Sequence, residues 1–134
     1  MNETIAAENK PVEERETYFF DTYAMIEVIR GNPKYNFYTK SSIITAIFNL
    51  AELNYNLKKE MSKEKADKYT EDYFDFLVDI SLNDLEEAMD LKIKHKDLSI
   101  PDVIGYIAAK NHGVKFLTGD EGFRNLDNVE FVKK

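Results

Sequence analysis

Short apolar runs alternate with longer stretches of helical periodicity along this sequence, and this alternation limits the folds that the chain can adopt. Residues 18–20, 115–118 and 129–132 are short runs rich in aromatic and β-branched side chains, which is typical of buried strands. Between them, apolar side chains recur every three or four residues, as on one face of a helix. Strands separated by helices predict an α/β fold of three layers, with a short parallel central sheet and helices on both faces.

The ends of the predicted helices are marked by capping residues. Ser62 suits the N-cap of one helix, and Asn83 with Glu86 three residues later resembles a capping box. Ser99 opens another helix with proline in its first turn, and Gly113 ends it. The predicted helices are 22–30, 45–60 and 83–95, one that begins at Ser62, and one from Ser99 to Gly113. Residues 76–80 are predicted as a strand and residues 43–44 as a strand or the lead-in to a helix. Residues 119–128 are predicted as a loop or a short helix.

Length and composition favour a single cytoplasmic domain. The 134 residues suit one domain, predicted at 17–134, after a mobile acidic arm at 1–16. Cysteine is absent, which excludes disulfides and thiol catalysis and favours a reducing compartment. No apolar run approaches the ~20 residues needed to cross a bilayer, and no secretory signal opens the chain, so we expect no membrane contact.

The net charge of −7 argues against nucleic-acid binding through a generally basic surface. Neutralising phosphates over a wide area needs clustered lysine and arginine. An acidic nuclease is compatible with this charge, because it meets its substrate locally, through metal ions and a few basic side chains.

Two aspartates are predicted at the carboxyl ends of strands. Asp21 directly follows the first apolar run, and Asp120 lies two residues beyond Thr118. In parallel α/β sheets, active sites lie beyond these ends of the strands. Each acid also has a structural interpretation, Asp21 as a helix N-cap and Asp120 as a turn residue.

Two further acids are predicted on helices. Asp102 lies three residues after Ser99, where it also suits a capping arrangement at the start of a helix. Glu52 belongs to a polar stripe with spacings of four, three and four residues, made of Thr45, Asn49, Glu52 and Asn56. A solvated face of this protein would carry lysine and glutamate. The stripe instead has uncharged threonine and asparagine around a single glutamate, so it indicates the wall of a polar pocket.

Four carboxylates at one place form a coherent chemical set. Hard divalent cations such as Mg²⁺ and Mn²⁺ prefer oxygen ligands. Without metal, each close pair of carboxylates would repel by about 4 kcal/mol at ~4 Å and an effective dielectric near 20. A bound dication makes the same contacts favourable, activates a water and clamps the oxygens of an in-line phosphoryl displacement.

Four segments of the chain, in this order, resemble the motifs of PIN-domain nucleases, particularly archaeal and VapC-like members. They are Phe20-Asp21-Thr22, Asn49-Leu50-Ala51-Glu52-Leu53, Ser99-Ile100-Pro101-Asp102 with the apolar helix that follows it, and Leu117-Thr118-Gly119-Asp120-Glu121-Gly122-Phe123. The resemblance covers about Tyr18 to Lys133. Tyr23 departs from it, because a small residue is more usual at that position.

The resemblance implies a PIN-like fold and a metal-dependent endoribonuclease. Asp21, Asp102 and Asp120 would hold Mg²⁺ or Mn²⁺, and Glu52 would hold a second ion or orient the attacking water. Thr118 would support the site by hydrogen bonding. These four acids are therefore the predicted catalytic and metal-binding residues, with Asn49 of the polar stripe as a second supporting residue.

Other polar residues receive weaker or structural assignments. Glu121 and Asp127 are both candidates for a further acid of the site, and the sequence does not choose between them. His95 and His112 are predicted to stabilise helix ends, since two separate histidines make no metal motif. Arg124 is predicted to be solvated at the surface, with a phosphate contact as the alternative.

The predicted function is cleavage of single-stranded RNA by metal-activated water. The resemblance suggests the toxin component of a type II toxin–antitoxin pair, with a cognate antitoxin as partner and a homodimer as its assembly. Two alternatives are an RNA-processing PIN nuclease outside any toxin pair and a PIN-fold binding module without catalysis.

Overall fold

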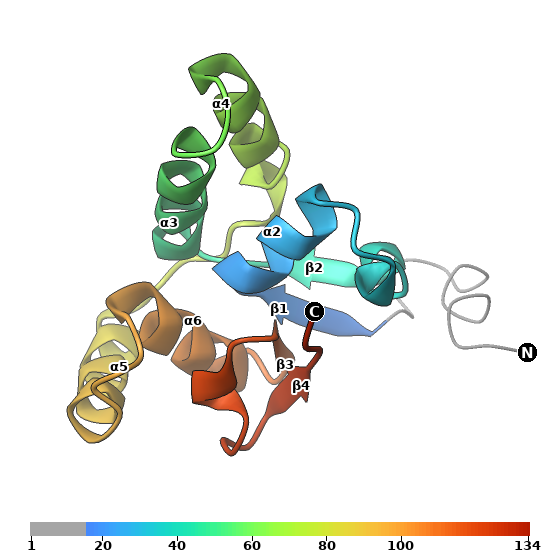
Figure 1. The fold of residues 1–134 in the computed structure, drawn as a ribbon. Coiled ribbons are helices and arrows are strands. Elements are labelled where there is room, and N and C mark those ends of the chain that lie inside the picture. Colours follow the sequence, from blue (N-terminus) through green and yellow to red (C-terminus); the bar gives the residue numbers. More distant parts are fainter. Residues whose placement is uncertain (1–15) are drawn as a thin grey trace, which may run out of the picture.

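The structure is a computed structural model that describes residues 16–134. Its four strands form one sheet in the order β2-β1-β3-β4, and every neighbouring pair is parallel. The strands are β1 (Thr17–Phe20), β2 (Ser42–Ile44), β3 (Lys115–Thr118) and β4 (Val129–Phe131) (Figure 1). The predicted arm lies outside the described residues, except for Glu16.

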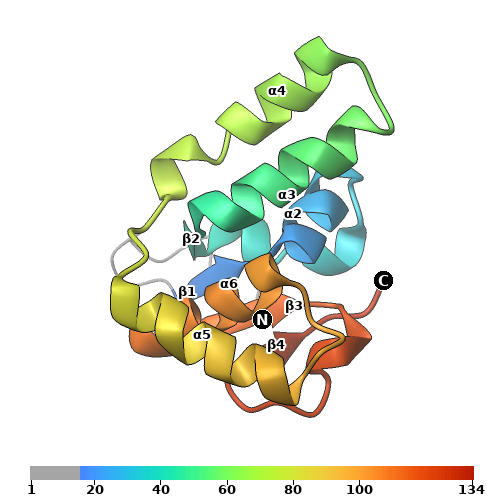
Figure 2. The same ribbon diagram turned by 90° about the vertical axis from the view of Figure 1, so that its left-hand side faces the viewer.

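Helices cover both faces of this sheet. On one face lie α2 (Thr22–Ile29), α3 (Ile47–Lys58) and α4 (Lys63–Glu71), and on the other lie α5 (Leu82–Lys94) and α6 (Ile100–Asn111) (Figures 1 and 2). The 3-10 helices η2 (Pro33–Tyr35), η3 (Tyr38–Lys40), η4 (Phe74–Phe76) and η5 (Glu121–Phe123) complete the connections. The predicted three-layer α/β class is confirmed.

The core is divided by the sheet into two apolar clusters, because successive strand residues point to opposite faces. In β1, Phe19 packs into the cluster with α5 and α6, whereas Tyr18 and Phe20 pack into the cluster with α2, α3 and α4. In β3, Phe116 and Leu117 divide in the same way. Each fully buried phenylalanine stabilises the fold by about 2–3 kcal/mol. The short strands are therefore stabilised mainly by the packing of their side chains against the helices on both faces of the sheet.

The order of the strands determines where a site can form. The chain leaves β1 for β2 on one side, and β3 then pairs with β1 on the other side. The connections therefore diverge between β1 and β3, and ligands of open α/β sheets bind at such a point, beyond the carboxyl ends of the strands. Asp21 follows β1 and Asp120 follows β3, so both acids lie at this point.

Three local predictions were wrong. α3 begins at Ile47 because Thr45 forms an isolated parallel bridge with Leu77 and lies at the end of β2. Residues 76–80 make only that bridge and no strand, since η4 extends through Phe76. The capping box of α5 is formed by Ser81 with Asp84, two residues earlier than the predicted Asn83.

Other end signals were confirmed. Ser62 caps α4, and Ser99 caps α6 with proline in its first turn. Gly113 follows α6 with a φ of 69°, a conformation that glycine adopts without strain. None of the helices in residues 16–134 combines the length and apolar character needed to cross a membrane.

Candidate active site

Asp21 is the most buried acid of the candidate site. It is the N-cap of α2, where its carboxylate accepts a hydrogen bond from the Ala24 backbone N–H at 2.8 Å, and it is 1% exposed. Burial raises the pKa of Asp21 well above its ordinary value; hydrogen bonds from Thr118 and Ala24 oppose the shift, and the charges of Asp102 and Asp120 add to it. The structural and functional interpretations of Asp21 are therefore compatible, since a cap uses only part of the carboxylate.

Thr118 connects the acids that follow β1 and β3. Its hydroxyl group is hydrogen-bonded to the Asp21 carboxylate and also accepts the Asp120 backbone N–H at 3.1 Å. Asp120 is in turn the N-cap of η5, accepting the Gly122 N–H at 2.9 Å. A fully buried threonine at the end of β3 thus fixes the distance between the two loops that carry Asp21 and Asp120.

Asp102 reaches the same place from the first turn of α6. Its carboxylate accepts the Ser99 N–H at 2.8 Å, and its own N–H donates to the Ser99 hydroxyl oxygen at 3.2 Å, which makes a complete capping box. Burial raises the pKa of Asp102 to about 6; the Ser99 backbone opposes the shift, and the charges of Glu52 and Asp120 add to it.

Glu52 reaches the site from α3, across from α6. It is half-buried, and its Oε2 accepts a long hydrogen bond from the Ser99 hydroxyl at 3.4 Å. Ser99 therefore contacts both Glu52 and Asp102, a role that the sequence did not reveal because the N-cap position alone explains a serine there. The stripe of Glu52 is shorter than predicted, since Thr45 precedes the helix.

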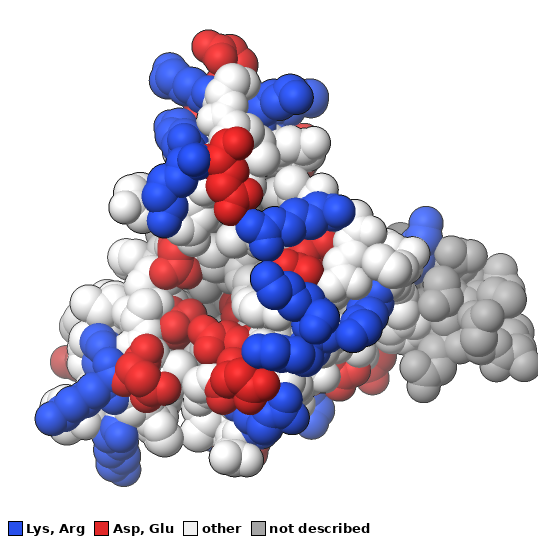
Figure 3. Space-filling model, in the orientation of Figure 1, with Lys and Arg blue, Asp and Glu red and all other residues white. Residues whose placement is uncertain are grey.

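The four acids form one electrostatic group at the carboxyl edge of the sheet. The negative charges of Asp120 and Asp102 act on Asp21, and those of Glu52 and Asp120 act on Asp102. Within residues 16–134, no ion pair includes any of the four. Figure 3 shows acidic side chains gathered at the centre of this face, with basic side chains along one side of them.

This donor set fits a divalent cation. A buried carboxylate with no cationic partner is costly, and a dication would remove that cost. The set contains only oxygen donors, which suits Mg²⁺ or Mn²⁺. In the described part of the chain, no group of three or more His, Asp or Glu side chains is arranged as a metal-binding cluster.

Asn49 lies behind the acids, between α3 and α6. Its side chain is fully buried, Nδ2 donates to the Pro101 carbonyl oxygen at 3.4 Å, and Oδ1 has no partner. A Cβ at Gly105 would lie 2.9 Å from that Oδ1, so glycine at this position permits the close approach of the two helices. Asn49 thus contacts Pro101, the residue before Asp102, and lies next to the group of four acids without belonging to it.

The two additional acid candidates differ in their partners. Glu121 accepts hydrogen bonds from Arg124 at 2.7 and 2.9 Å and pairs with Lys133 at 3.4 Å. Asp127 accepts the Tyr106 hydroxyl and pairs with Lys110. Both carboxylates are therefore occupied by cations, unlike the four acids of the candidate site.

The remaining polar predictions concern the histidines and Arg124. His95 and His112 are the C-cap residues of α5 and α6, as predicted. Arg124 is exposed, pairs with Glu121 and lies over the ring of Phe131.

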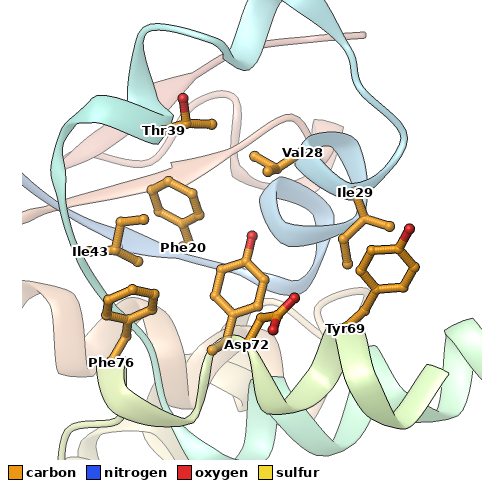
Figure 4. A pocket seen from close by; sticks show the side chains of 9 residues that line it. Phe20, Val28, Ile29, Thr39, Ile43, Tyr69, Asp72 and Phe76 are labelled. Carbon is orange, nitrogen blue, oxygen red and sulfur yellow. The ribbon is translucent and has the colours of Figure 1, made fainter. Parts of the chain in front are cut away.

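An apolar cavity of about 330 Å³ lies away from the acids. It is bounded by β1, α2, β2 and the end of α4, and its lining is mostly aromatic and aliphatic (Figure 4). Asp72 is its single acidic lining residue. The cavity has none of the metal chemistry of the carboxylate group.

The family model of the PIN domain matches residues 18–129. The chain belongs to the PIN-domain family. This membership makes the nuclease class the expected class of activity for this PIN domain.

Solved structures share the fold at low sequence identity. VapC20 of Mycobacterium tuberculosis, described as a sarcin–ricin loop cleaving toxin, has a TM-score of 0.72 and 13% identity over 87% of this chain and 99% of its own. A toxin–antitoxin complex from Klebsiella pneumoniae has a TM-score of 0.69 and 18% sequence identity, over 87% of this chain and 99% of its own. DNA-bound VapBC from Salmonella typhimurium has a TM-score of 0.66 and 15% sequence identity, over 88% of this chain and 98% of its own. No curated protein sequence matched the chain.

Proposed function

We propose that this PIN domain is a metal-dependent endoribonuclease that cuts single-stranded RNA. The observation that carries the proposal is the unpaired group of Asp21, Asp102, Asp120 and Glu52, brought by four separate elements to the carboxyl edge of the sheet. Burial and the neighbouring acids raise the pKa of Asp21 and of Asp102, and such shifts are typical of functional sites. The alternative of a binding module without catalysis leaves this accumulation of charge unexplained.

The residues have distinct proposed roles. Asp21, Asp102 and Asp120 hold the divalent cation, and Glu52 holds a second ion or orients the attacking water. When bound, Mg²⁺ or Mn²⁺ supplies an activated water and neutralises charge on the phosphodiester. The water oxygen forms the new bond to phosphorus as the bond to the 3′ oxygen breaks, which leaves a 5′-phosphate and a 3′-hydroxyl.

Thr118 and Asn49 are proposed as positioning residues. The Thr118 hydroxyl connects Asp21 to the backbone of Asp120, so it keeps two ligands in register. Asn49 braces the first turn of α6 through Pro101, and thereby the Asp102 carboxylate. Supporting side chains of this kind commonly contribute 10–100-fold to metal affinity or activity.

The biological role that we propose is the toxin of a type II toxin–antitoxin pair in the cytoplasm. Its support is the likeness of fold to proteins described as VapC toxins and VapBC complexes. This role implies a cognate antitoxin partner and a homodimer. The alternative within the same chemistry is an RNA-processing nuclease outside any toxin pair.

Cleavage of a single-stranded RNA oligonucleotide tests the activity directly. The expected result is cutting with Mg²⁺ or Mn²⁺, none in excess EDTA, and products that carry 5′-phosphates. Undiminished cutting in EDTA, or 2′,3′-cyclic ends, would rule out this mechanism. A preparation of Asp120→Asn, purified in parallel, controls for contaminating ribonucleases.

Expression in a bacterial host tests the toxin role. Induction of the wild-type chain is expected to arrest growth, whereas Asp120→Asn is not. If a small reading frame lies immediately upstream of its gene, co-expression of that frame should relieve the arrest and form a stable complex. An active nuclease that leaves growth unchanged would instead favour the RNA-processing alternative.

A further inference from the structure

The segment that follows β4, Val132–Lys134, is held in place by four hydrogen bonds, one of which runs from the Val132 N–H to the Thr118 carbonyl oxygen at 2.8 Å. The Tyr35 hydroxyl donates to the Val132 carbonyl oxygen at 2.6 Å, and the Lys34 Nζ donates to the Lys133 carbonyl oxygen at 3.2 Å. The Lys134 backbone N–H donates to the Tyr23 hydroxyl at 3.2 Å. All four bonds involve the backbone of the segment, so the side chains of Lys133 and Lys134 are left for other contacts.

This segment lies directly against the loop that carries Asp120. A Cβ added at Gly119 would lie 2.4 Å from the Val132 carbonyl oxygen and 2.3 Å from the ring of Tyr23. Only glycine therefore allows this approach, and Gly119 immediately precedes Asp120. The unusual size of Tyr23 also has an explanation here, since its ring packs on Gly119 and its hydroxyl anchors Lys134.

The contacts place the ammonium groups of Lys34 and Lys133 and the backbone of Lys134 beside the loop that carries Asp120, on a chain whose net charge is −7. Lys133 lies 3.4 Å from Glu121, the residue after Asp120, and the side chain of Lys34 reaches the backbone of Lys133. Figure 3 shows basic side chains along one side of the central acids. We name this set of Lys34, Lys133 and Lys134 the basic strip.

The basic strip is available to an anionic ligand. Glu121 is already bound by Arg124 at 2.7 and 2.9 Å, so its pairing with Lys133 leaves an excess of positive charge. The Lys133–Glu121 pair is also about half exposed on both sides, at 48% and 53%, and such pairs are weak. A phosphate group can therefore take the place of Glu121 at Lys133.

We propose that the basic strip binds the phosphodiester backbone of the RNA next to the scissile bond. The proposal rests on the nuclease function proposed above and adds the contact that holds the substrate. The acids repel a polyanion, so an RNA strand needs cations on at least one side of them. Lysine recognises phosphate as a point charge, so this contact is independent of base sequence.

The decisive variant is Lys133→Gln with Lys134→Gln. It removes two charges but retains the Lys133 carbonyl and the Lys134 N–H that hold the segment. The matched control is Lys63→Gln with Lys65→Gln, which makes the same change in net charge at the exposed start of α4. Equal melting temperatures of the two variants and the wild type would show that all three are folded.

Binding is measured with a short single-stranded RNA oligonucleotide in EDTA, so that no cutting occurs. Each lost phosphate contact reduces the salt slope of log K by about 0.7, which corresponds to about fivefold in Kd at 0.1 M salt. The double variant should therefore bind about 25-fold more weakly, with a slope lower by about 1.4. The control should bind like the wild type.

Kinetics in Mn²⁺ separate this inference from the proposed function. The Lys133→Gln, Lys134→Gln variant should raise KM and leave kcat near that of the wild type, as expected for a contact made equally in the ground and transition states. Normal cutting with unchanged KM and Kd, or equal losses in the control, would overturn the basic strip alone. RNA binding that depends on the strip without any cutting would overturn the nuclease function alone, and a wild type that neither binds nor cuts would overturn both.

Discussion

Two helices of this PIN domain begin with the same capping box, and their aspartates have opposite electrostatic character. In α5, Ser81 and Asp84 exchange hydrogen bonds of 3.0 Å each, and in α6 Ser99 and Asp102 exchange bonds of 2.8 and 3.2 Å. Burial tends to raise the pKa of both aspartates. The pKa of Asp84 is nevertheless lowered, whereas that of Asp102 is raised to about 6.

The difference arises from what faces each carboxylate. Asn111 donates to Asp84 at 2.6 Å, and the nearby His112 also favours its charged form. Asp102 instead faces the negative charges of Glu52 and Asp120. The motif S-x-x-D is thus sufficient to start a helix in both places, and only the neighbours across the fold distinguish a structural acid from a candidate metal ligand.

The largest expected contrast is in catalysis. Asp102→Asn should lower kcat on single-stranded RNA by on the order of 100-fold or more, because a ligand contributes at least as much as its supporting layer. Asp84→Asn should leave kcat near the wild-type value. Initial rates at saturating Mn²⁺ measure both, and a fully active Asp102→Asn would make the two capping boxes equivalent.

The same experiment extends to the rest of the group. Asp21→Asn and Asp120→Asn should match the loss of Asp102→Asn, and Glu52→Gln should lose less, since its proposed role is to hold a second ion or orient the water. His95→Ala serves as a control that should retain the wild-type rate. A set in which only one acid mattered would argue against a shared metal site.

Metal should stabilise the wild type and not the site variants. A ligand at a hundredfold excess over Kd stabilises the folded state by about 2.7 kcal/mol. Thermal melts with Mn²⁺ and with EDTA should show this gain in the wild type and in Asp84→Asn. Asp102→Asn should lose most of it, and a wild type that ignores Mn²⁺ would contradict the site.

The metal-free stabilities should change in opposite directions. In EDTA at pH 7, Asp102→Asn removes a charge that its neighbours disfavour, and we expect a gain of about 1–2 kcal/mol. Asp84→Asn breaks a satisfied buried network and should lose about 1–3 kcal/mol. Chemical denaturation in EDTA measures both, and a loss in both variants would leave Asp102 with only its capping role.

Dependence on pH should sharpen the same contrast in EDTA. Because the folded pKa of Asp102 is raised, its contribution to stability is fully present below the unfolded value near 4 and decreases as the pH rises through about 6. Because the folded pKa of Asp84 is lowered, its contribution is present above about 4 and decreases as the pH falls. The gain of Asp102→Asn over the wild type should therefore shrink between pH 7 and pH 4.

The smallest expected effect comes from removing Asn111, the hydrogen-bond donor that favours the charged form of Asp84. Asn111→Ala deletes the 2.6 Å hydrogen bond and should cost about 1 kcal/mol in the free energy of unfolding. Catalysis should not change. Titration of Asp84 by NMR should show a pKa that rises towards that of Asp102, and an unchanged pKa would mean that Asn111 is not the cause of the difference.

The sequence predicted much of the fold because its signals are local. Aromatic runs, helical spacing and the serine caps at Ser62 and Ser99 each act within a few residues, and the structure has them at those positions. The predicted cap at Asn83 was wrong because Ser81 with Asp84 satisfies the same rule two residues earlier. Thr45 was misassigned because its bridge to Leu77 is a tertiary contact that periodicity cannot show.

The candidate site was predictable as a set of acids but not as a network. Strand ends and helix starts indicated Asp21, Asp102 and Asp120, since these positions converge in any parallel sheet. The hydrogen bonding of Thr118 was expected only from the family resemblance, whereas the bridging role of Ser99 and the contact of Tyr23 with Gly119 depend on segments far apart in the chain. No local pattern encodes such contacts.

The pairing of β1 with β3 has a further consequence for how the protein becomes active. Phe20 pairs with Leu117, so the centre of the sheet joins opposite ends of the described chain. Closing so long a loop is entropically slow, and folding rates fall as contacts become less local. A chain emerging from the ribosome contains Asp21 well before it contains Asp120. The carboxylate group is therefore complete only after β3 has paired with β1, so the nuclease proposed above would be inactive until its sheet has formed.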